Sequence, residues 1–177
     1  MNLECSDPSL WKEALSSYST RIQSLNKPNL ISLDDFYCNQ LPPILHQRNP
    51  NPYITTTELS TLMQWKLTRG KWRPRLLDFV SSLDEALVKS TSQKAFQSLP
   101  DVSKAVSELT VLKGVGPATA SAILAAYAPD LAPFMSDEEL SSEGDTFTPS
   151  DVERALWSVA VGAKINPCKT SKRKRKS

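Results

Sequence analysis

The sequence predicts an all-α fold built as a single multi-helix domain. Along most of the chain, apolar residues recur at spacings of three and four, which places them on one side of a helix. No segment alternates between apolar and polar residues for the length of a strand. Proline, serine and threonine separate the periodic segments, as they do where short helices follow one another. With 177 residues, we expect one domain over 1–163 and a disordered basic tail over 164–177.

Capping residues set the expected helix boundaries. Serine, threonine and aspartate accept hydrogen bonds from first-turn amides, proline fits the first helical position, and glycine favours a helix end. Thr55 and Glu58 have the spacing of a capping box, and so do Ser82 and Glu85. The segment 42–52, which begins with two prolines, is expected to be a loop. These signals predict helices over about 7–25, 32–41, 55–70, 74–80, 82–99, 101–109, 117–128 and 149–159.

Few residues in this chain are suited to bind a metal. His46 is the only histidine, and the cysteines Cys5, Cys38 and Cys168 are widely spaced. This composition excludes an iron–sulfur loop or a Cys/His zinc site, and we expect neither a metal nor another cofactor. The N-terminus lacks the basic and apolar regions of a signal peptide, and no apolar run approaches the roughly 20 residues that cross a bilayer. We therefore expect no membrane partner.

The net charge of +2 combines a basic segment with an acidic body. Six of the 21 basic residues, and no acid, lie within 169–177. The rest of the chain carries 15 basic side chains (21 − 6) and 19 acidic ones, a net charge of −4. A dense basic run is typical of a nuclear-import signal, although a solubilising tail has the same composition. We expect nuclear localisation, with import through Lys172, Arg173, Lys174, Arg175 and Lys176.

The motif Lys113-Gly114-Val115-Gly116 lies between two predicted helices and is the most informative in the sequence. Two glycines allow a tight turn and a close approach of the backbone to a ligand. The helix that follows directs unpaired amides and the positive end of its dipole outward, which suits an anion. A plain corner between helices, with glycines that serve only the turn, is the alternative. We expect phosphate contacts from Lys113, Gly114, Val115, Gly116 and Thr119, with the Val115 side chain between the helices.

A second candidate binding segment runs from Trp65 to Arg75. It contains five basic residues, two tryptophans and no acid. Cations bind phosphates, and an exposed indole stacks on a base. In the alternative interpretation the tryptophans are core anchors and the cations form a solvated face; the spacing from Leu62 favours burial of Trp65. The cations expected to serve a nucleic-acid surface are Lys66, Arg69, Lys71, Arg73 and Arg75.

The segment Leu112-Lys113-Gly114-Val115-Gly116-Pro117-Ala118-Thr119-Ala120 resembles the hairpin of the helix–hairpin–helix DNA glycosylase superfamily. More narrowly, this segment together with 65–75 and 134–138 resembles the Amun-type family, a eukaryotic group described as glycosylase-like. The resemblance spans about residues 10–160. It implies a helix–hairpin–helix motif within the all-α domain, binding to duplex DNA, and a part in base excision repair.

The resemblance also implies a catalytic residue. The related glycosylases carry an aspartate a little over twenty residues after the first hairpin glycine, and Asp137 lies 23 residues after Gly114. Such an aspartate would stabilise the oxocarbenium-like sugar as the glycosidic bond breaks, once the nucleotide has left the duplex. Ala118 stands where bifunctional glycosylases have a lysine, so the expected activity is a monofunctional N-glycosylase without a lyase step. The alternative for Asp137 is a structural role at a helix start, in the capping-box segment 136–139.

A competing interpretation is an inert adaptor that retains the fold and binds a protein partner. Between residues 114 and 163, Arg154 is the only basic residue among eight acids. Because phosphate contacts normally use basic side chains or backbone amides, this acidic region predicts that any DNA footprint is narrow. We also expect the protein to be a monomer. The acids are Asp130, Asp137, Glu138, Glu139, Glu143, Asp145, Asp151 and Glu153.

Overall fold

The computed structural model describes residues 8–134 and 149–165, and every regular element within these ranges is helical. The expected all-α fold is therefore confirmed. In chain order the elements are α1 (Pro8–Ser16), α2 (Tyr18–Ser24), α3 (Leu30–Asp35), the π-helical turn η1 (Phe36–Gln40), α4 (Leu41–Gln47), α5 (Thr56–Arg69), α6 (Pro74–Ser81), α7 (Glu85–Ser98), α8 (Val102–Leu109), α9 (Pro117–Tyr127) and α10 (Pro149–Ile165). In these two ranges, no helix has both the length and the apolar character that a membrane crossing needs.

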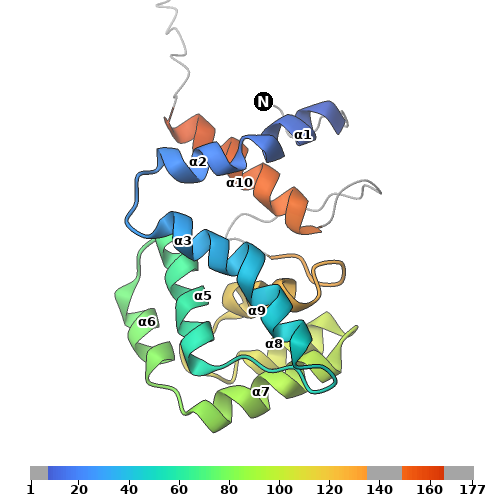
Figure 1. Ribbon diagram of the computed structural model, residues 1–177. Helices are drawn as coiled ribbons and strands as arrows, with labels where there is room; N and C mark the ends of the chain where they lie inside the picture. The colour runs from blue at the N-terminus through green and yellow to red at the C-terminus, as the bar shows by residue number, and fades with distance from the viewer. Residues whose placement is uncertain (1–7, 135–148, 166–177) are drawn as a thin grey trace, which may run out of the picture.

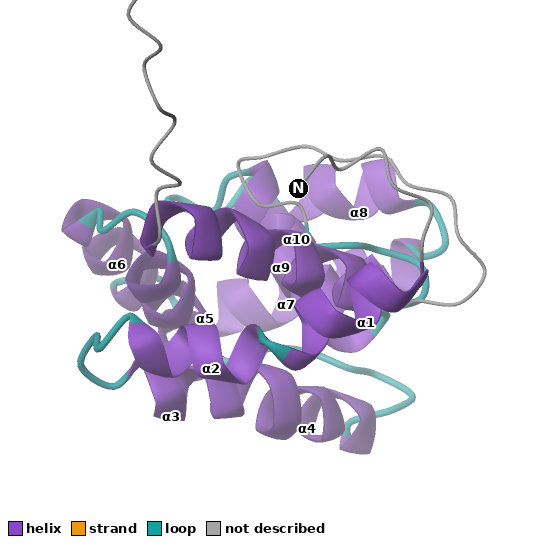
Figure 2. Cartoon of the chain, turned by 90° about the horizontal axis from the view of Figure 1, so that it is seen from above, coloured by secondary structure: helices purple, strands orange, loops and turns teal. Residues whose placement is uncertain are grey.

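The helices form two groups that pack on each other (Figure 1). Helices α1, α2 and α10 gather at one end of the molecule, and α3 to α9 form the body below them. Seen from above in Figure 2, α10 again lies with α1 and α2, although it is the last helix described. One contiguous apolar core includes buried side chains from α2 and from the body, and Trp157 of α10 packs against it. The two groups therefore share a single core.

The expected loop over 42–52 is wrong in its first half, which forms α4. Pro42 and Pro43 occupy the first turn of this helix, where a missing amide hydrogen loses no intrahelical partner. The π-helical turn η1 leads into α4, with the amide of Leu41 donating to the carbonyl of Phe36, five residues earlier. The helical run therefore continues through the two prolines by way of the π-helical turn, and proline does not end it here.

The predicted capping box is present at the start of α5, whereas α7 is capped by a different residue from the one predicted. The capping box forms at the start of α5: the Thr55 side chain accepts a hydrogen bond from the Glu58 amide, and the Glu58 side chain accepts one from the Thr55 amide. The second expected box, of Ser82 and Glu85, is wrong, because Asp84 caps α7 by accepting from an amide of its first turn. Glu85 therefore does not cap α7, and its carboxylate accepts a hydrogen bond from the neighbouring helix α5.

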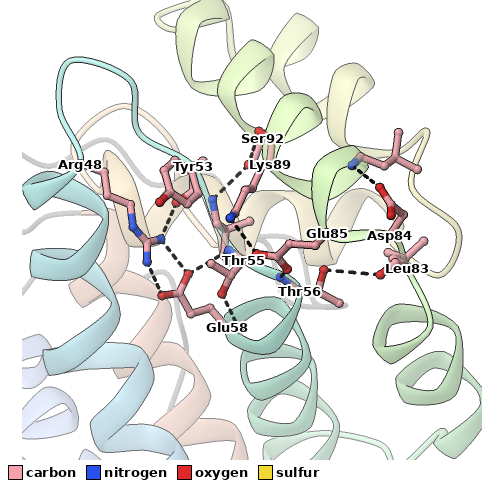
Figure 3. A network of polar contacts seen from close by, with 12 residues as sticks. Arg48, Tyr53, Thr55, Thr56, Glu58, Leu83, Asp84, Glu85, Lys89 and Ser92 are labelled. Carbon is pink, nitrogen blue, oxygen red and sulfur yellow. Dashed lines mark hydrogen bonds and ion pairs between the residues drawn. The ribbon is translucent and has the colours of Figure 1, made fainter.

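Polar side chains join the loop between α4 and α5 to both α5 and α7 (Figure 3). The guanidinium of Arg48 donates to the two carboxylate oxygens of Glu58, at 2.8 and 2.7 Å, and to the carbonyl of Tyr53. Glu85 of α7 accepts a hydrogen bond of 2.8 Å from the amide of Thr56, the first residue of α5. Two carboxylates thus lie at the amino end of α5, where they complement the positive end of its dipole.

This network lowers the pKa of Glu58. Burial by itself favours the neutral acid, but the hydrogen bonds from Arg48 and Thr55 outweigh it, so the pKa of Glu58 lies below its ordinary value. A carboxyl whose pKa is lower in the folded state stabilises the fold above its unfolded pKa. This contribution is lost as the pH falls through the folded pKa.

Glu58→Gln should therefore lower stability at neutral pH and make the loss of stability in acid less steep. The difference in unfolding free energy between the native protein and the variant should be largest above about pH 4.3, the ordinary glutamate value, and should shrink below it. Urea denaturation from neutral pH into the acid range measures this difference. Asp130→Asn, at an exposed carboxylate outside the network, is the control. A difference that stays constant across the pH range would contradict the assignment.

Trp65 lies in the centre of the core, as its spacing predicts. Its side chain is 1% exposed and stacks on Tyr37, with 3.7 Å between the ring centroids. The indole nitrogen donates to Asp34 Oδ1 at 2.8 Å, and the hydroxyl of Tyr18 donates to the same oxygen at 2.6 Å. Asp34 therefore joins α2, α3 and α5 while satisfying two polar groups that burial would otherwise leave without partners.

An ion pair buried between α5 and α10 connects the two groups of helices. The Arg69 guanidinium donates to both carboxylate oxygens of Glu153, at 2.8 and 2.9 Å, and the two side chains are 3% and 9% exposed. The Trp157 ring covers the guanidinium, with 4.3 Å between the Arg69 Cζ and the ring centroid. Burial by itself disfavours the charged guanidinium, but the attraction of Glu153 outweighs it and holds the pKa of Arg69 above its ordinary value. Arg69 is thus a charged structural residue.

Glu153→Gln should destabilise the protein by about 3 kcal/mol or more, because it leaves the Arg69 charge buried without a counter-charge. The loss is measured by urea or thermal unfolding. The control is Asp151→Asn on the same helix, which removes a partly exposed pair with Arg154 and should cost less than about 1 kcal/mol. Similar losses in the two variants would mean that the buried pair does not hold α10 in place.

Candidate nucleic-acid interface

The turn between α8 and α9 requires a glycine at its first glycine position. Gly114 has a φ of +91°, a conformation that L side chains rarely adopt. A Cβ at this residue would lie 3.0 Å from the Cβ of Phe79 and 3.3 Å from Cγ2 of Val80. The turn therefore packs directly against α6, and a larger residue would force the two apart.

Gly116 has the opposite surroundings. It is exposed, and a Cβ built on it would meet no atom within 4 Å. Its carbonyl accepts hydrogen bonds from the amides of Thr119 and Ala120, at 3.0 and 2.9 Å, as suits the residue that precedes α9. Across residues 8–134 and 149–165, no atom accepts a hydrogen bond from the amide of Gly116 or of Ala118. Two amides at the positive end of the α9 dipole are thus without a partner there.

Two residues expected to contact phosphate are buried, and their amides donate within the turn. Val115 is 4% exposed, and its amide donates to the carbonyl of Leu112 at 3.0 Å. Thr119 is 3% exposed, and its amide donates to the carbonyl of Gly116. The amides of Val115 and Thr119 are therefore not free to bind a phosphate, because both close the turn, whereas the buried Val115 side chain agrees with its predicted place between the helices.

The turn and the basic segment meet along α6. The Lys113 ammonium lies 4.4 Å from the centroid of the Phe79 ring, and Gly114 packs against the same residue. Arg75 precedes Phe79 by four residues, so the two side chains share a face of α6. Phe79 is not among the predicted binding residues, and its spacing from Arg75 is the one signal in the sequence that points to it. The fold thus places two separate candidate segments side by side.

The basic segment divides into buried and exposed cations. Lys71, Arg73 and Arg75 are exposed, and none of them forms an ion pair with a carboxylate of the described residues. Lys66 is half-buried on α5. The expected nucleic-acid contact of Arg69 is wrong, because its guanidinium is buried and already paired with a carboxylate inside the protein. The exposed cations are therefore confined to the connection between α5 and α6 and to the first turn of α6.

Other expected functional residues lie outside the described ranges. Asp137 belongs to 135–148, and the basic run 172–176 belongs to 166–177. Of the eight acids between 114 and 163, the structure describes Asp130, Asp151 and Glu153, and of these three only Asp130 is exposed. The acidic surface expected for a protein partner therefore has little support among these three residues.

Comparisons with known proteins add no assignment. The chain matches no protein-family model, no curated protein and no solved structure. Among the residues that the structure describes, no group of three or more His, Cys, Asp or Glu side chains could hold a metal ion. The features that point to a function are therefore the turn, α6 and the exposed cations beside them.

The two glycines of the turn should respond differently to alanine. Gly114→Ala should destabilise the protein by about 1–3 kcal/mol, because alanine is strained at this φ and its Cβ would press on Phe79. Gly116→Ala should change stability by less than about 1 kcal/mol, because its Cβ enters open space. Urea denaturation of the two variants measures the contrast. Equal stability of both variants would contradict the close packing of the turn on α6.

Proposed function

We propose that the protein binds the phosphate backbone of DNA through the turn between α8 and α9 and the adjoining part of α6. The observation that carries this proposal is the pair of unpartnered amides at the start of α9, on a turn that packs against α6 with its exposed cations. A helix N-terminus binds anions because its amides point at the ligand and its dipole favours negative charge. We name this surface the hairpin face; it consists of Lys71, Arg73, Arg75, Lys113, Gly116 and Ala118.

The groups of the hairpin face support one another. A single surface cation attracts an anion weakly, since water and salt screen the charge. Several cations that act with oriented amides bind a row of phosphates more tightly, because each contact releases counterions from the DNA. Contacts of this kind position the nucleic acid and carry no sequence information. The proposed binding is therefore narrow, independent of sequence and sensitive to salt.

The resemblance of this turn to a glycosylase hairpin extends the proposal to base excision. In this proposal Asp137 stabilises the oxocarbenium-like sugar while a damaged or modified base leaves, and no lyase step follows. Two features support this role for Asp137. It lies 23 residues after Gly114 in the sequence, and the turn of the hairpin face precedes it in the chain. The basic run 172–176 supports a nuclear location for this activity.

DNA binding should depend steeply on salt and on the exposed arginines. Affinity for a fluorescent duplex should fall strongly as the salt concentration rises from about 50 to 200 mM. The double variant Arg73→Gln/Arg75→Gln should bind DNA on the order of tenfold more weakly at low salt. The slope of log affinity against log salt concentration should also fall in magnitude by roughly two. Lys12→Gln is the control, because Lys12 is exposed on α1, away from α6. Fluorescence anisotropy measures both quantities.

A matched pair of variants tests the turn itself in the same assay. Gly116→Glu places a negative charge beside the unpartnered amides, where open space accepts the side chain, and Gly116→Gln has the same size without the charge. The glutamate variant should bind DNA clearly more weakly than the glutamine variant, with equal thermal stability. Equal affinity of the two, or binding that ignores salt, would contradict phosphate binding at this face.

Base release tests the catalytic part of the proposal. The native protein should release a base from duplex oligonucleotides that carry damaged or modified bases, and Asp137→Asn should abolish the release while DNA binding persists. If the native protein binds DNA and releases no base from any substrate, the protein is an inert adaptor and the glycosylase proposal fails.

A further inference from the structure

Trp72 is the only exposed Phe, Tyr or Trp side chain among the described residues. Its side chain is 53% exposed, whereas Trp65, seven residues earlier, is 1% exposed. An indole that packs in a core removes a large apolar area from water, so an exposed one forgoes that stabilisation. Within 8–134 and 149–165, no ring–ring or cation–ring contact involves Trp72. More than half of the residue is thus exposed to solvent, and no aromatic ring or cation of the described residues stacks on its indole.

The neighbours of Trp72 are cations. Lys71 and Arg73 adjoin it in the chain, Arg75 follows on α6, and all three are exposed. A protein partner with an apolar patch would gain little from three exposed cations so near the indole in the chain. A nucleic-acid strand matches the arrangement, because it offers a base with a flat π face and a negative phosphate at every nucleotide.

The connection that carries Trp72 is short and anchored at both ends. The structure leaves only residues 70–73 between α5 and α6. The amide of Gly70 donates to a carbonyl in the last turn of α5, and the Lys27 ammonium donates to the carbonyls of Thr68 and Gly70. At the other end, Pro74 begins α6. Because the backbone on both sides is already fixed, ordering the backbone at Trp72 costs little conformational entropy when a ligand binds.

We propose that Trp72 stacks on an unpaired base, so that the protein binds DNA containing an unstacked or single-stranded base more tightly than regular duplex. This inference rests on the proposed function, because the hairpin face supplies the phosphate contacts that bring a strand to Trp72. In regular duplex, each base is covered by its neighbours and offers no free face to the indole. An unpaired base offers that face, and stacking on an aromatic side chain does not depend on which base it is.

The test compares a single-stranded thymidine oligonucleotide with a duplex of the same length, by anisotropy at one salt concentration. Trp72→Ala should weaken single-strand binding roughly tenfold and leave duplex binding within about twofold of the native value. Trp72→Phe should retain most of the single-strand affinity, because a phenyl ring also stacks. A similar loss on both DNAs, or no loss on the single strand, would overturn the inference.

Tryptophan fluorescence gives a readout that a structural role of Trp72 would not change. The chain has four tryptophans, and Trp72→Phe removes only the exposed one. The single strand should quench the emission of the native protein and quench that of Trp72→Phe much less. Equal quenching in the two proteins would overturn the inference. If the native protein binds neither DNA, the proposed function itself fails; if it binds both and Trp72→Ala changes neither affinity, only the stacking inference fails.

Discussion

The packing of Gly114 against α6 decides where the candidate binding groups lie. Because this residue has no Cβ and a φ of +91°, the turn before α9 approaches α6 closely enough for a Cβ to lie only 3.0 Å from that of Phe79. The same contact brings Lys113 over the Phe79 ring and onto the helix that carries Arg75. A turn held away from α6 would separate the free amides of α9 from these cations. The hairpin face therefore depends on one steric constraint, and its charges alone would not create it.

Burial decides which arginines are structural and which are free to bind. Arg69 is buried, so it requires a carboxylate partner, and Glu153 supplies one through two hydrogen bonds. Arg73 and Arg75 are exposed, where water solvates them and no partner is needed. The same division applies to the tryptophans: Trp65 is buried and its nitrogen donates to Asp34, whereas Trp72 remains in solvent. A single basic and aromatic segment thus contributes to the core and to the surface.

The two groups of helices contribute differently to the proposed binding surface and to the core. The hairpin face belongs entirely to the body, on the connection after α5, on α6, on the turn before α9 and on the first turn of α9. Helices α1, α2 and α10 lie at the carboxyl end of α5, where the buried ion pair and Asp34 join them to the body. Their contribution is to complete the core and to neutralise Arg69. The surface that we propose for DNA therefore lies on α6 and the turn, and the stability of α5 beneath it depends on α10.

The sequence by itself determined the helical class and the features that neighbours within about four residues control. The capping box of Thr55, the start of α9 at Pro117 and the burial of Trp65 are of this kind. Tertiary structure decided the rest, because the partner comes from a distant segment. The carboxylate that pairs with the buried Arg69 is 84 residues away. Local periodicity sets which face of a helix is apolar, whereas only packing sets which distant groups that face meets.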